Sequence, residues 1–262
     1  HYGVGVGRGI FSNGLLSAED GCVYMGEYFR NQERSDVRIY GSQDNGKRWE
    51  VVYLFNPGTI RHIHALQKDP YTGKLWVCSG DEDDEAMIGW SDDGFRTIHE
   101  IGKGSQIWRT TQLVFTEEAI YWGTDTGSEY LAGIYRWDKA EKKISRLHHS
   151  DGAILFGTRL NWGMLAFTTD REGFPNEKDK KTRVLIHHSG DQISEICMGT
   201  WNDQLKGHRS GFAMLRIPRN QGSSRLIFSV INHKEITNGD LLVIPEHILL
   251  ELSDISSTSS DP

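Results

Sequence analysis

Long apolar runs and long helix-forming runs are both missing from this chain of 262 residues. No hydrophobic stretch approaches the roughly 18 residues that cross a bilayer, so we expect no membrane insertion. Continuous runs of Ala, Leu, Glu and Lys are also scarce, whereas the chain contains 29 glycines. Glycine-rich sequences with many β-branched and aromatic residues favour short strands joined by tight turns. The composition therefore predicts an all-β protein with very little helix.

An excess of positive charge is absent as well, because 29 Lys and Arg face 36 Asp and Glu, a formal net charge of −7. Nucleic-acid binding requires a concentrated positive charge to contact the phosphates, so we expect no nucleic-acid partner. The net charge does not exclude local basic pockets. The chain has only three cysteines, an odd number. Cys22, Cys78 and Cys197 lack metal-ligand spacing, and two of them lie in apolar strand-like runs, so we expect buried free thiols.

Serine-led hairpin sequences recur along the chain. Ser42 to Trp49 reads SQDNGKRW, Ser91 to Phe95 reads SDDGF, and Ser189 opens SGD. The first two serines are 49 residues apart, and the third follows at twice that spacing. The period leaves one unmarked repeat near residues 133–147 and places a fifth turn near residues 238–240. Four-stranded units of roughly 40–50 residues that repeat along a chain are typical of β-propellers.

The period predicts five β-propeller blades over residues 1–252, followed by a flexible polar tail over residues 253–262. A further N-terminal part would make the parent six- or seven-bladed. The expected strands are 9–17, 21–28, 37–42 and 49–55 in blade one; four strands within 60–97 in blade two, the second over 74–78; 109–115, 119–124, 133–137 and 143–148 in blade three; 153–159, 163–169, 182–188 and 193–198 in blade four; and 211–217, 225–231, 240–244 and 247–252 in blade five.

The segment from Ser42 to Trp49 resembles the Asp box, S-x-D-x-G-x-x-W, of sialidases and other propeller glycosidases, lyases and some non-enzymatic propellers. The copy at Ser91 is one residue shorter, and the copy at Ser189 keeps only serine and aspartate. The resemblance implies a structural role, in which the Asp side chain hydrogen-bonds turn amides and the aromatic ring packs inward. It supports a sialidase-like propeller fold, and it constrains activity much less, because fold does not fix function.

Charged residues collect at the strand ends that would surround one central pocket. In a propeller the inner strand of each blade starts on the face where the second strand ends. The predicted inner-strand starts carry Arg8, Arg61 with His62 and His64, Trp108 with Arg109, and His208 with Arg209. The predicted second-strand ends carry Glu27 with Tyr28, Asp81 with Glu82, Asp125, and Asp170.

This ring of arginines suits an acidic glycan, because guanidinium forks bind carboxylates bidentately and acid–base groups are poised nearby. A sialate- or uronate-containing oligo- or polysaccharide fits that description. The residues expected to bind it are Arg8, Arg61, Trp108, Arg109, Asp125, His208 and Arg209. The alternative is that these arginines form solvated ion pairs at the rim, as on any protein surface.

Two mechanisms use this set. In a glycoside hydrolase, Glu27 and Asp81 would divide the acid and base roles, or Tyr28 would be the nucleophile, as in sialidases. In a lyase, an arginine would neutralise a uronate while His62, His64 or Tyr28 takes the proton beside the carboxylate. The abundance of histidine favours the lyase.

A non-catalytic propeller that binds glycan or protein through the same face is the alternative function. In that case Trp108, Tyr130 and Trp162 would offer stacking surfaces to sugar rings.

No metal or other cofactor is expected. His62 and His64 lie on one face of a strand and could bind a metal, yet no third ligand is identifiable by spacing. The acidic run from Asp81 to Glu85 offers oxygen ligands, including Asp81 and Asp83, that suit calcium. It lacks the EF-hand spacing and its glycine, so we favour a solvated acidic loop.

Overall fold

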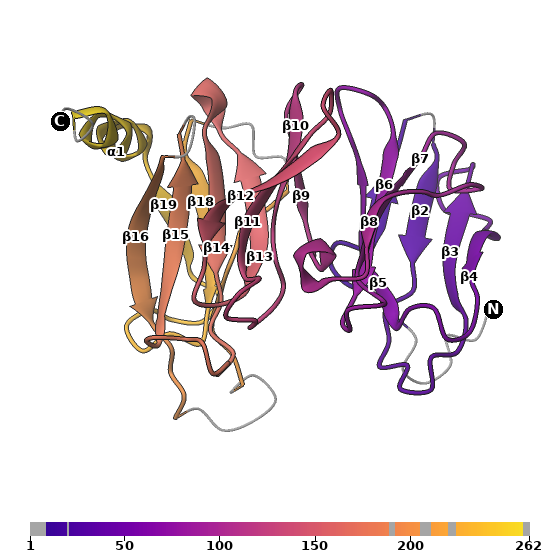
Figure 1. Ribbon diagram of the computed structural model, residues 1–262, viewed down its shortest axis with the longest axis horizontal. Helices are drawn as coiled ribbons and strands as arrows, with labels where there is room; N and C mark the ends of the chain where they lie inside the picture. Colours follow the sequence, from indigo (N-terminus) through magenta and orange to yellow (C-terminus); the bar gives the residue numbers. More distant parts are fainter. Residues whose placement is uncertain (1–8, 20, 189–191, 205–210, 220–223, 259–262) are drawn as a thin grey trace. The chain divides into compact units, whose positions relative to one another are not determined.

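The computed structural model describes residues 9–19, 21–188, 192–204, 211–219 and 224–258, and its regular secondary structure is almost entirely antiparallel β-sheet (Figure 1). Its contacts divide the chain into two compact units, His1–Glu117 and Glu118–Pro262. Five sheets occur in the described part of the chain. Among the described helices, none combines the length and apolar content that a membrane span requires.

The first unit contains two four-stranded sheets whose strands follow sequence order from the first to the fourth. One sheet is formed by β1 (Leu15–Ser17), β2 (Val23–Gly26), β3 (Val37–Ser42) and β4 (Glu50–Phe55). The other is formed by β5 (His62–Lys68), β6 (Leu75–Gly80), β7 (Met87–Ser91) and β8 (His99–Lys103), and the 3-10 turn η1 (Gln106–Trp108) and β9 (Leu113–Phe115) follow it. Each sheet is a blade of the kind that builds β-propellers.

Burial falls from the inner to the outer strand of the second blade. Every residue of β6 is buried and so is almost all of β5, whereas β8 is largely exposed. Ile39, Ile63, Leu66 and Phe95 are among the side chains that form the hydrophobic core of this unit. The near-continuous apolar runs of the sequence are therefore inner strands that are covered on both faces.

The two complete serine-led hairpins have the hydrogen bonds that the turn chemistry predicts. Asp44 Oδ1 accepts from the backbone N–H groups of Lys47 at 3.0 Å and Arg48 at 2.8 Å. Asp93 Oδ1 likewise accepts from the Thr97 N–H at 2.9 Å. Each carboxylate also accepts a hydrogen bond from the serine two residues before it. The third copy, Ser189–Asp191, lies outside the described residues.

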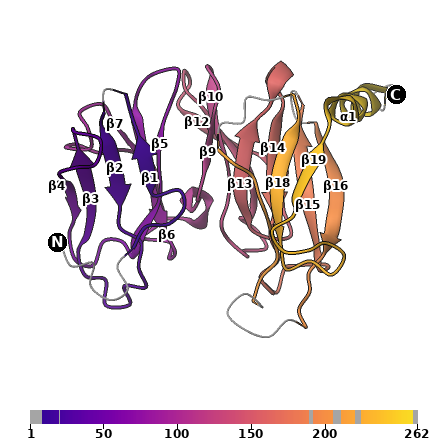
Figure 2. The ribbon, with the colours of Figure 1, turned by 180° about the vertical axis from the view of Figure 1, so that it is seen from behind.

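The second unit contains three further sheets (Figure 2). Its strands are β10 (Ala119–Gly123), β11 (Gly133–Asp138) and β12 (Lys143–His149); β13 (Ile154–Arg159), β14 (Leu165–Thr169), β15 (Lys181–His187) and β16 (Ile193–Thr200); and β17 (Met214–Arg216), β18 (Leu226–Ile231) and β19 (Leu241–Ile244). A 3-10 turn, η2 (Asn161–Gly163), lies between β13 and β14. The predicted all-β propeller fold is confirmed, and five sheets stand where five blades were expected.

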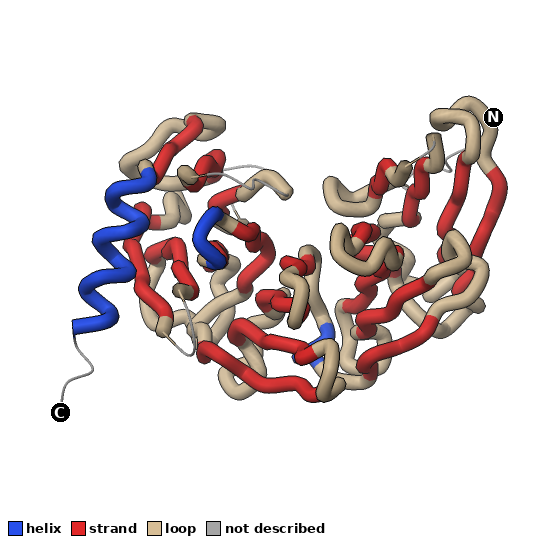
Figure 3. Tube along the Cα trace, turned by 90° about the horizontal axis from the view of Figure 1, so that it is seen from above, coloured by secondary structure: helices blue, strands red, loops and turns tan. Residues whose placement is uncertain are grey.

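The prediction of a final strand over residues 247–252 is wrong. Helix α1 (Glu246–Thr258) occupies this segment and is the long blue element of Figure 3. Leu249 is fully buried in the core of the second unit, and Ile248 and Leu252 pack against the same core. Positions i, i+1 and i+4 share one face of a helix, so this spacing buries all three together. The helix also extends across the boundary at residue 253 where we expected the tail to begin.

The three thiols are free, but only one of them is buried. Cys78 lies inside β6, Cys22 is partly exposed, and Cys197 is exposed on the outer strand β16. The expectation of buried thiols therefore holds for Cys78 and fails for the partly exposed Cys22 and the exposed Cys197. Burial raises the pKa of the Cys78 thiol well above its usual value.

Candidate functional site

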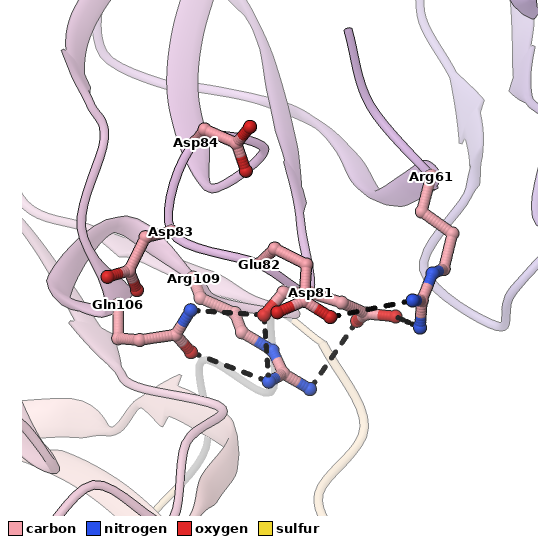
Figure 4. A pocket seen from close by; sticks show the side chains of 7 residues that line it. All are labelled: Arg61, Asp81, Glu82, Asp83, Asp84, Gln106 and Arg109. Carbon is pink, nitrogen blue, oxygen red and sulfur yellow. Dashed lines mark hydrogen bonds and ion pairs between the residues drawn. The ribbon is translucent and has the colours of Figure 1, made fainter. Parts of the chain in front are cut away.

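An open cavity of about 670 Å³ lies at one end of the second blade, within the first unit. Arginine, glutamine and carboxylate side chains form its wall (Figure 4). They are Arg61, Asp81, Glu82, Asp83, Asp84, Gln106 and Arg109.

The β5–β6 hairpin positions the two central residues of this cavity. His62, the first residue of β5, pairs with Gly80, the last residue of β6. Arg61 and Asp81, the next residues outward on the two strands, are therefore neighbours. The strand ends of this blade meet as predicted.

Arg109 reaches the same place from the end of η1. A Cβ atom on Gly80 would lie 3.1 Å from the Arg109 Cγ atom. The missing side chain of Gly80 thus leaves room for the arginine to lie across the strand end.

Asp81 is the residue to which Arg61, Gln106 and Arg109 all bind. Arg61 Nη1 donates to Asp81 Oδ2 at 2.7 Å, and Arg109 Nη2 lies 3.4 Å from Asp81 Oδ1. Arg109 Nη1 and Gln106 Nε2 donate to the main-chain oxygen of Asp81 at 3.2 and 3.0 Å (Figure 4). Glu82 Oε1 lies 3.5 Å from Arg61 Nη2 and is largely exposed. Both the side chain and the backbone of Asp81 are therefore fixed.

Behind Asp81 lies a pair of buried histidines. The Nε2 atoms of His62 and His64 are 3.1 Å apart. They lie 3.5 and 3.3 Å from Asp81 Oδ1, respectively. The Tyr28 ring stacks on His62 with the ring centroids 3.9 Å apart. The histidine pair thus adjoins the cavity through Asp81 and is covered by Tyr28.

A β-bulge lies at His64, in the β5–β6 pairing. The β5–β6 register passes from the pair Ile63–Ser79 to the pair Ala65–Cys78, so His64 has no partner of its own on β6. Bulges re-aim side chains and are frequent beside active sites. His62 and His64 both face the Asp81 carboxylate beside this bulge.

Both imidazoles are also held on their far sides. His62 Nδ1 lies 2.8 Å from the carbonyl oxygen of Phe29, and His64 Nδ1 lies 3.3 Å from that of Thr110. Burial on its own would raise the pKa of Asp81, but the hydrogen bonds with His62 and His64 outweigh it, and the pKa is held well below its usual value. Asp81 is therefore an ionised carboxylate between cationic and imidazole groups.

Two predicted site residues of the first unit have other surroundings. Glu27 is buried, and its carboxylate accepts from the Arg38 N–H at 2.9 Å and the Tyr40 hydroxyl at 3.1 Å. It thereby links β2 to β3. Trp108 is only 8% exposed, and a Cβ atom on Gly102 would collide with its ring. The expectation that Trp108 offers a stacking face to sugar is wrong, because the ring is covered by the β8 backbone.

The remaining predicted residues do not belong to this cavity as the structure describes it. Arg8, His208 and Arg209 lie outside the described residues. Asp125 and Asp170 belong to the second unit, and Asp170 is fully buried rather than at a rim. Burial, reinforced by the charges of Glu172 and Asp125, raises the pKa of Asp170 well above its usual value.

The acidic loop differs in part from the solvated loop that we expected. Glu82, Asp83 and Asp84 are exposed, whereas Glu85 is buried and forms an ion pair with Arg34. Sequence reasoning also missed Gln106, which lines the cavity and donates to the main-chain oxygen of Asp81. Its only signal was its position shortly before Trp108 and Arg109.

No protein-family model and no curated protein sequence matches this chain. Solved structures are similar to it in fold. The GH74 xyloglucanase of Xanthomonas campestris has a TM-score of 0.59 at 11% identity, covering 84% of this chain and 35% of that one. This chain thus spans about a third of the xyloglucanase.

Two further solved structures have a similar fold. A structure of a nidogen/laminin complex has a TM-score of 0.51 at 9% identity and covers 90% of this chain and 76% of that one. A putative gluconolactonase has a TM-score of 0.50 at 10% identity, and the match covers 86% of this chain and 88% of that one. At these identities the comparisons establish the β-propeller fold alone.

Proposed function

We propose that this protein is a carbohydrate-active enzyme that acts on an acidic glycan in the Asp81 cavity. The observation that carries the proposal is the convergence of two arginines and two histidines on one ionised carboxylate at the edge of an open cavity. Sites with a strongly shifted pKa and several convergent polar groups are frequently catalytic.

Arg61 and Arg109 would hold the carboxylate of the sugar. A guanidinium has five N–H donors, and the contact of Arg61 with Asp81 uses only its Nη1 group. Nη2 lies 3.5 Å from the exposed Glu82, which a ligand carboxylate can replace. Gln106 would add a neutral donor on the same wall.

Lyase chemistry fits the residues better than hydrolysis does. In such a reaction a base takes the proton from the carbon beside the uronate carboxylate, a carbon–carbon double bond forms, and the glycosidic oxygen leaves the next carbon and takes up a proton. The arginines would neutralise the carboxylate while the His62–His64–Asp81 cluster supplies the proton-transfer group. A hydrolase needs two carboxylates flanking the bond, and Glu27, the expected partner of Asp81, is engaged between β2 and β3.

The comparisons and the sequence motif lend general support. The xyloglucanase has a similar fold, and the Asp-box resemblance includes sialidases and polysaccharide lyases. The acidic character of the substrate rests on Arg61 and Arg109 alone.

A non-catalytic glycan-binding propeller is the second candidate. The observation in its favour is that Tyr130 and Trp162 in the second unit are 76% and 52% exposed. Exposed aromatic rings are suitable stacking surfaces for sugars.

Turnover of a panel of acidic polysaccharides tests the proposal. Reducing ends and the ultraviolet absorbance of unsaturated uronate are followed together, with wild type, Arg61→Ala and the control Arg48→Ala. Arg48 is 94% exposed and belongs to the Ser42 hairpin. We expect absorbance with wild type and Arg48→Ala and its loss with Arg61→Ala. Reducing ends without absorbance would replace the lyase by a hydrolase, and equal turnover by Arg61→Ala would overturn the site.

A further inference from the structure

We propose that His62, His64 and Asp81 form a binding site for one divalent transition-metal ion, with a geometry that suits zinc. The sequence supplied only the two histidines, and the fold supplies the third ligand. The inference goes beyond the proposed function, which requires no metal.

The three donor atoms have the spacing of a tetrahedral site. His62 Nε2, His64 Nε2 and Asp81 Oδ1 are separated by 3.1, 3.3 and 3.5 Å. Zinc binds imidazole nitrogen and carboxylate oxygen at about 2.0–2.2 Å, so two tetrahedral ligands lie about 3.3 Å apart. An octahedral ion with bonds of the same length would bring neighbouring ligands to about 2.9 Å. The observed triangle favours the tetrahedral ion.

The histidine tautomers point to the same conclusion. Carbonyl oxygens only accept, so His62 Nδ1 and His64 Nδ1 must carry the protons that Phe29 and Thr110 receive. In the neutral rings, both Nε2 atoms then present lone pairs to one another and to the Asp81 carboxylate. The two Nε2 atoms and Asp81 Oδ1 thus converge as the donor atoms of a metal site do, and Arg109 Nη2 lies 3.4 Å from Oδ1 at the edge of this cluster.

The surroundings of the three ligands are those found around metal ligands. A metal-binding histidine commonly donates its second N–H to a backbone carbonyl, and a ligating carboxylate is itself hydrogen-bonded. Both histidines donate in this way. Arg61 binds Asp81 Oδ2, whereas Oδ1 lies 3.3 Å from His64 Nε2 and 3.4 Å from Arg109 Nη2.

The site is buried on the histidine side and reaches the cavity through Asp81. Three protein ligands leave the fourth position of a tetrahedral zinc ion for water or a substrate oxygen. With a metal bound, the imidazoles would be ligands, and a water in the fourth position would supply the proton-transfer group in their place. This role of the water rests on the proposed function, whereas metal binding does not.

Calorimetric titration of tag-free, chelator-treated protein with Zn²⁺ tests the site without any substrate. We expect one equivalent to bind to wild type, and binding at least about 100-fold weaker in Asp81→Asn and His64→Gln, since even outer contacts of metal ligands are worth 10- to 100-fold. His99→Ala, which removes an exposed histidine of β8, is the matched control and should bind as wild type does. Circular dichroism checks that each variant is folded.

The wild-type protein also provides a test that needs no variant. Co²⁺ in place of Zn²⁺ should give the intense visible absorption of a tetrahedral site, and anomalous diffraction should place the ion within bonding distance of the three donor atoms. Absence of one-equivalent binding, unaltered affinity in folded Asp81→Asn, or an ion located elsewhere would each overturn the proposal. Metal binding without turnover of any glycan would refute the proposed function and still support the metal site.

Discussion

Arg61 Nη1 donates to Asp81 Oδ2 at 2.7 Å, and this contact joins the two sides of the cavity. The other oxygen of the same carboxylate faces His64 Nε2 at 3.3 Å. Asp81 thus orients an arginine that is suited to anion binding and a histidine pair that is suited to proton or metal chemistry. The predictions that follow start from this shared carboxylate.

Replacing Asp81 by Asn should abolish most of the activity and lower the stability of the fold. The amide keeps the shape of the side chain but leaves Arg61 and Arg109 without their anionic partner. Because these arginines are about a quarter exposed, we expect a loss of about 1–2 kcal/mol in unfolding free energy. Turnover should fall at least about 100-fold. Urea denaturation measures the stability and initial rates measure the turnover, and Asp92→Asn, an exposed residue of the Ser91 hairpin outside the cavity, is the control. Equal effects of the two variants would contradict the central position of Asp81.

Neutralising the acidic loop should strengthen the binding of an acidic glycan. Glu82, Asp83 and Asp84 are exposed carboxylates on the cavity wall, and they repel a ligand carboxylate. The triple variant Glu82→Gln, Asp83→Asn, Asp84→Asn should bind a few-fold, roughly 3- to 10-fold, more tightly at low salt. The gain should shrink as salt rises, because the screening length falls to about 8 Å at physiological ionic strength. Weaker binding by the triple variant would mean that these carboxylates contact the ligand directly.

The hairpin carboxylates should matter for stability and not for the cavity. Asp44 and Asp93 accept backbone N–H groups within their own turns. Hydrogen bonds with Thr97 lower the pKa of Asp93 to about 2. A lowered folded-state pKa stabilises the fold above the unfolded-state value near 4, and that contribution is lost as pH falls towards 2. Asp93→Ala should lower the urea midpoint at pH 7 but not at pH 2, and glycan affinity should stay unchanged; a change in affinity would count against the structural role.

Asp170 should make the second unit less stable as pH rises. The carboxyl group is fully buried, and burial raises its pKa well above the usual value. The folded state then holds a proton that the unfolded state has released above pH 4, so stability falls by up to about 1.4 kcal/mol per pH unit until the folded pKa is reached. Asp170→Asn cannot ionise and should flatten this slope, with its largest gain at high pH. Urea denaturation between pH 4 and 8 measures the unfolding free energy, and Asp240→Asn, at an exposed position, is the control. The same pH dependence of this free energy in Asp170→Asn and wild type would refute the prediction.

The hairpins could be predicted from the sequence because their interactions are local. Ser42 and Asp44 bind groups within four residues, so a short motif contains the whole arrangement. The meeting of Arg61 with Asp81 was also predictable, since a four-stranded blade places those strand ends together.

Features that depend on three-dimensional packing could not be predicted in this way. The sequence placed Asp81 and the two histidines at the same end of the blade, but no residue spacing encodes the 3.1–3.5 Å approach of their donor atoms. The burial of Trp108 depends on the backbone at Gly102. Helix α1 was missed because its apolar residues also fit a short buried strand, and only packing against the second core distinguishes the two.

The most direct test of the proposed function is calorimetric binding of an oligouronate and of its carboxyl-reduced, neutral counterpart to the same protein. Loss of a charge-assisted hydrogen bond costs about 1.5–3 kcal/mol, so the neutral ligand should bind about 10- to 100-fold more weakly. Arg61→Ala should lose affinity for the acidic ligand alone and so reduce the difference, since only Arg109 remains, while Arg48→Ala should keep the full difference. Equal affinity of wild type for both ligands, or an undiminished difference in folded Arg61→Ala, would contradict the account of the Asp81 cavity.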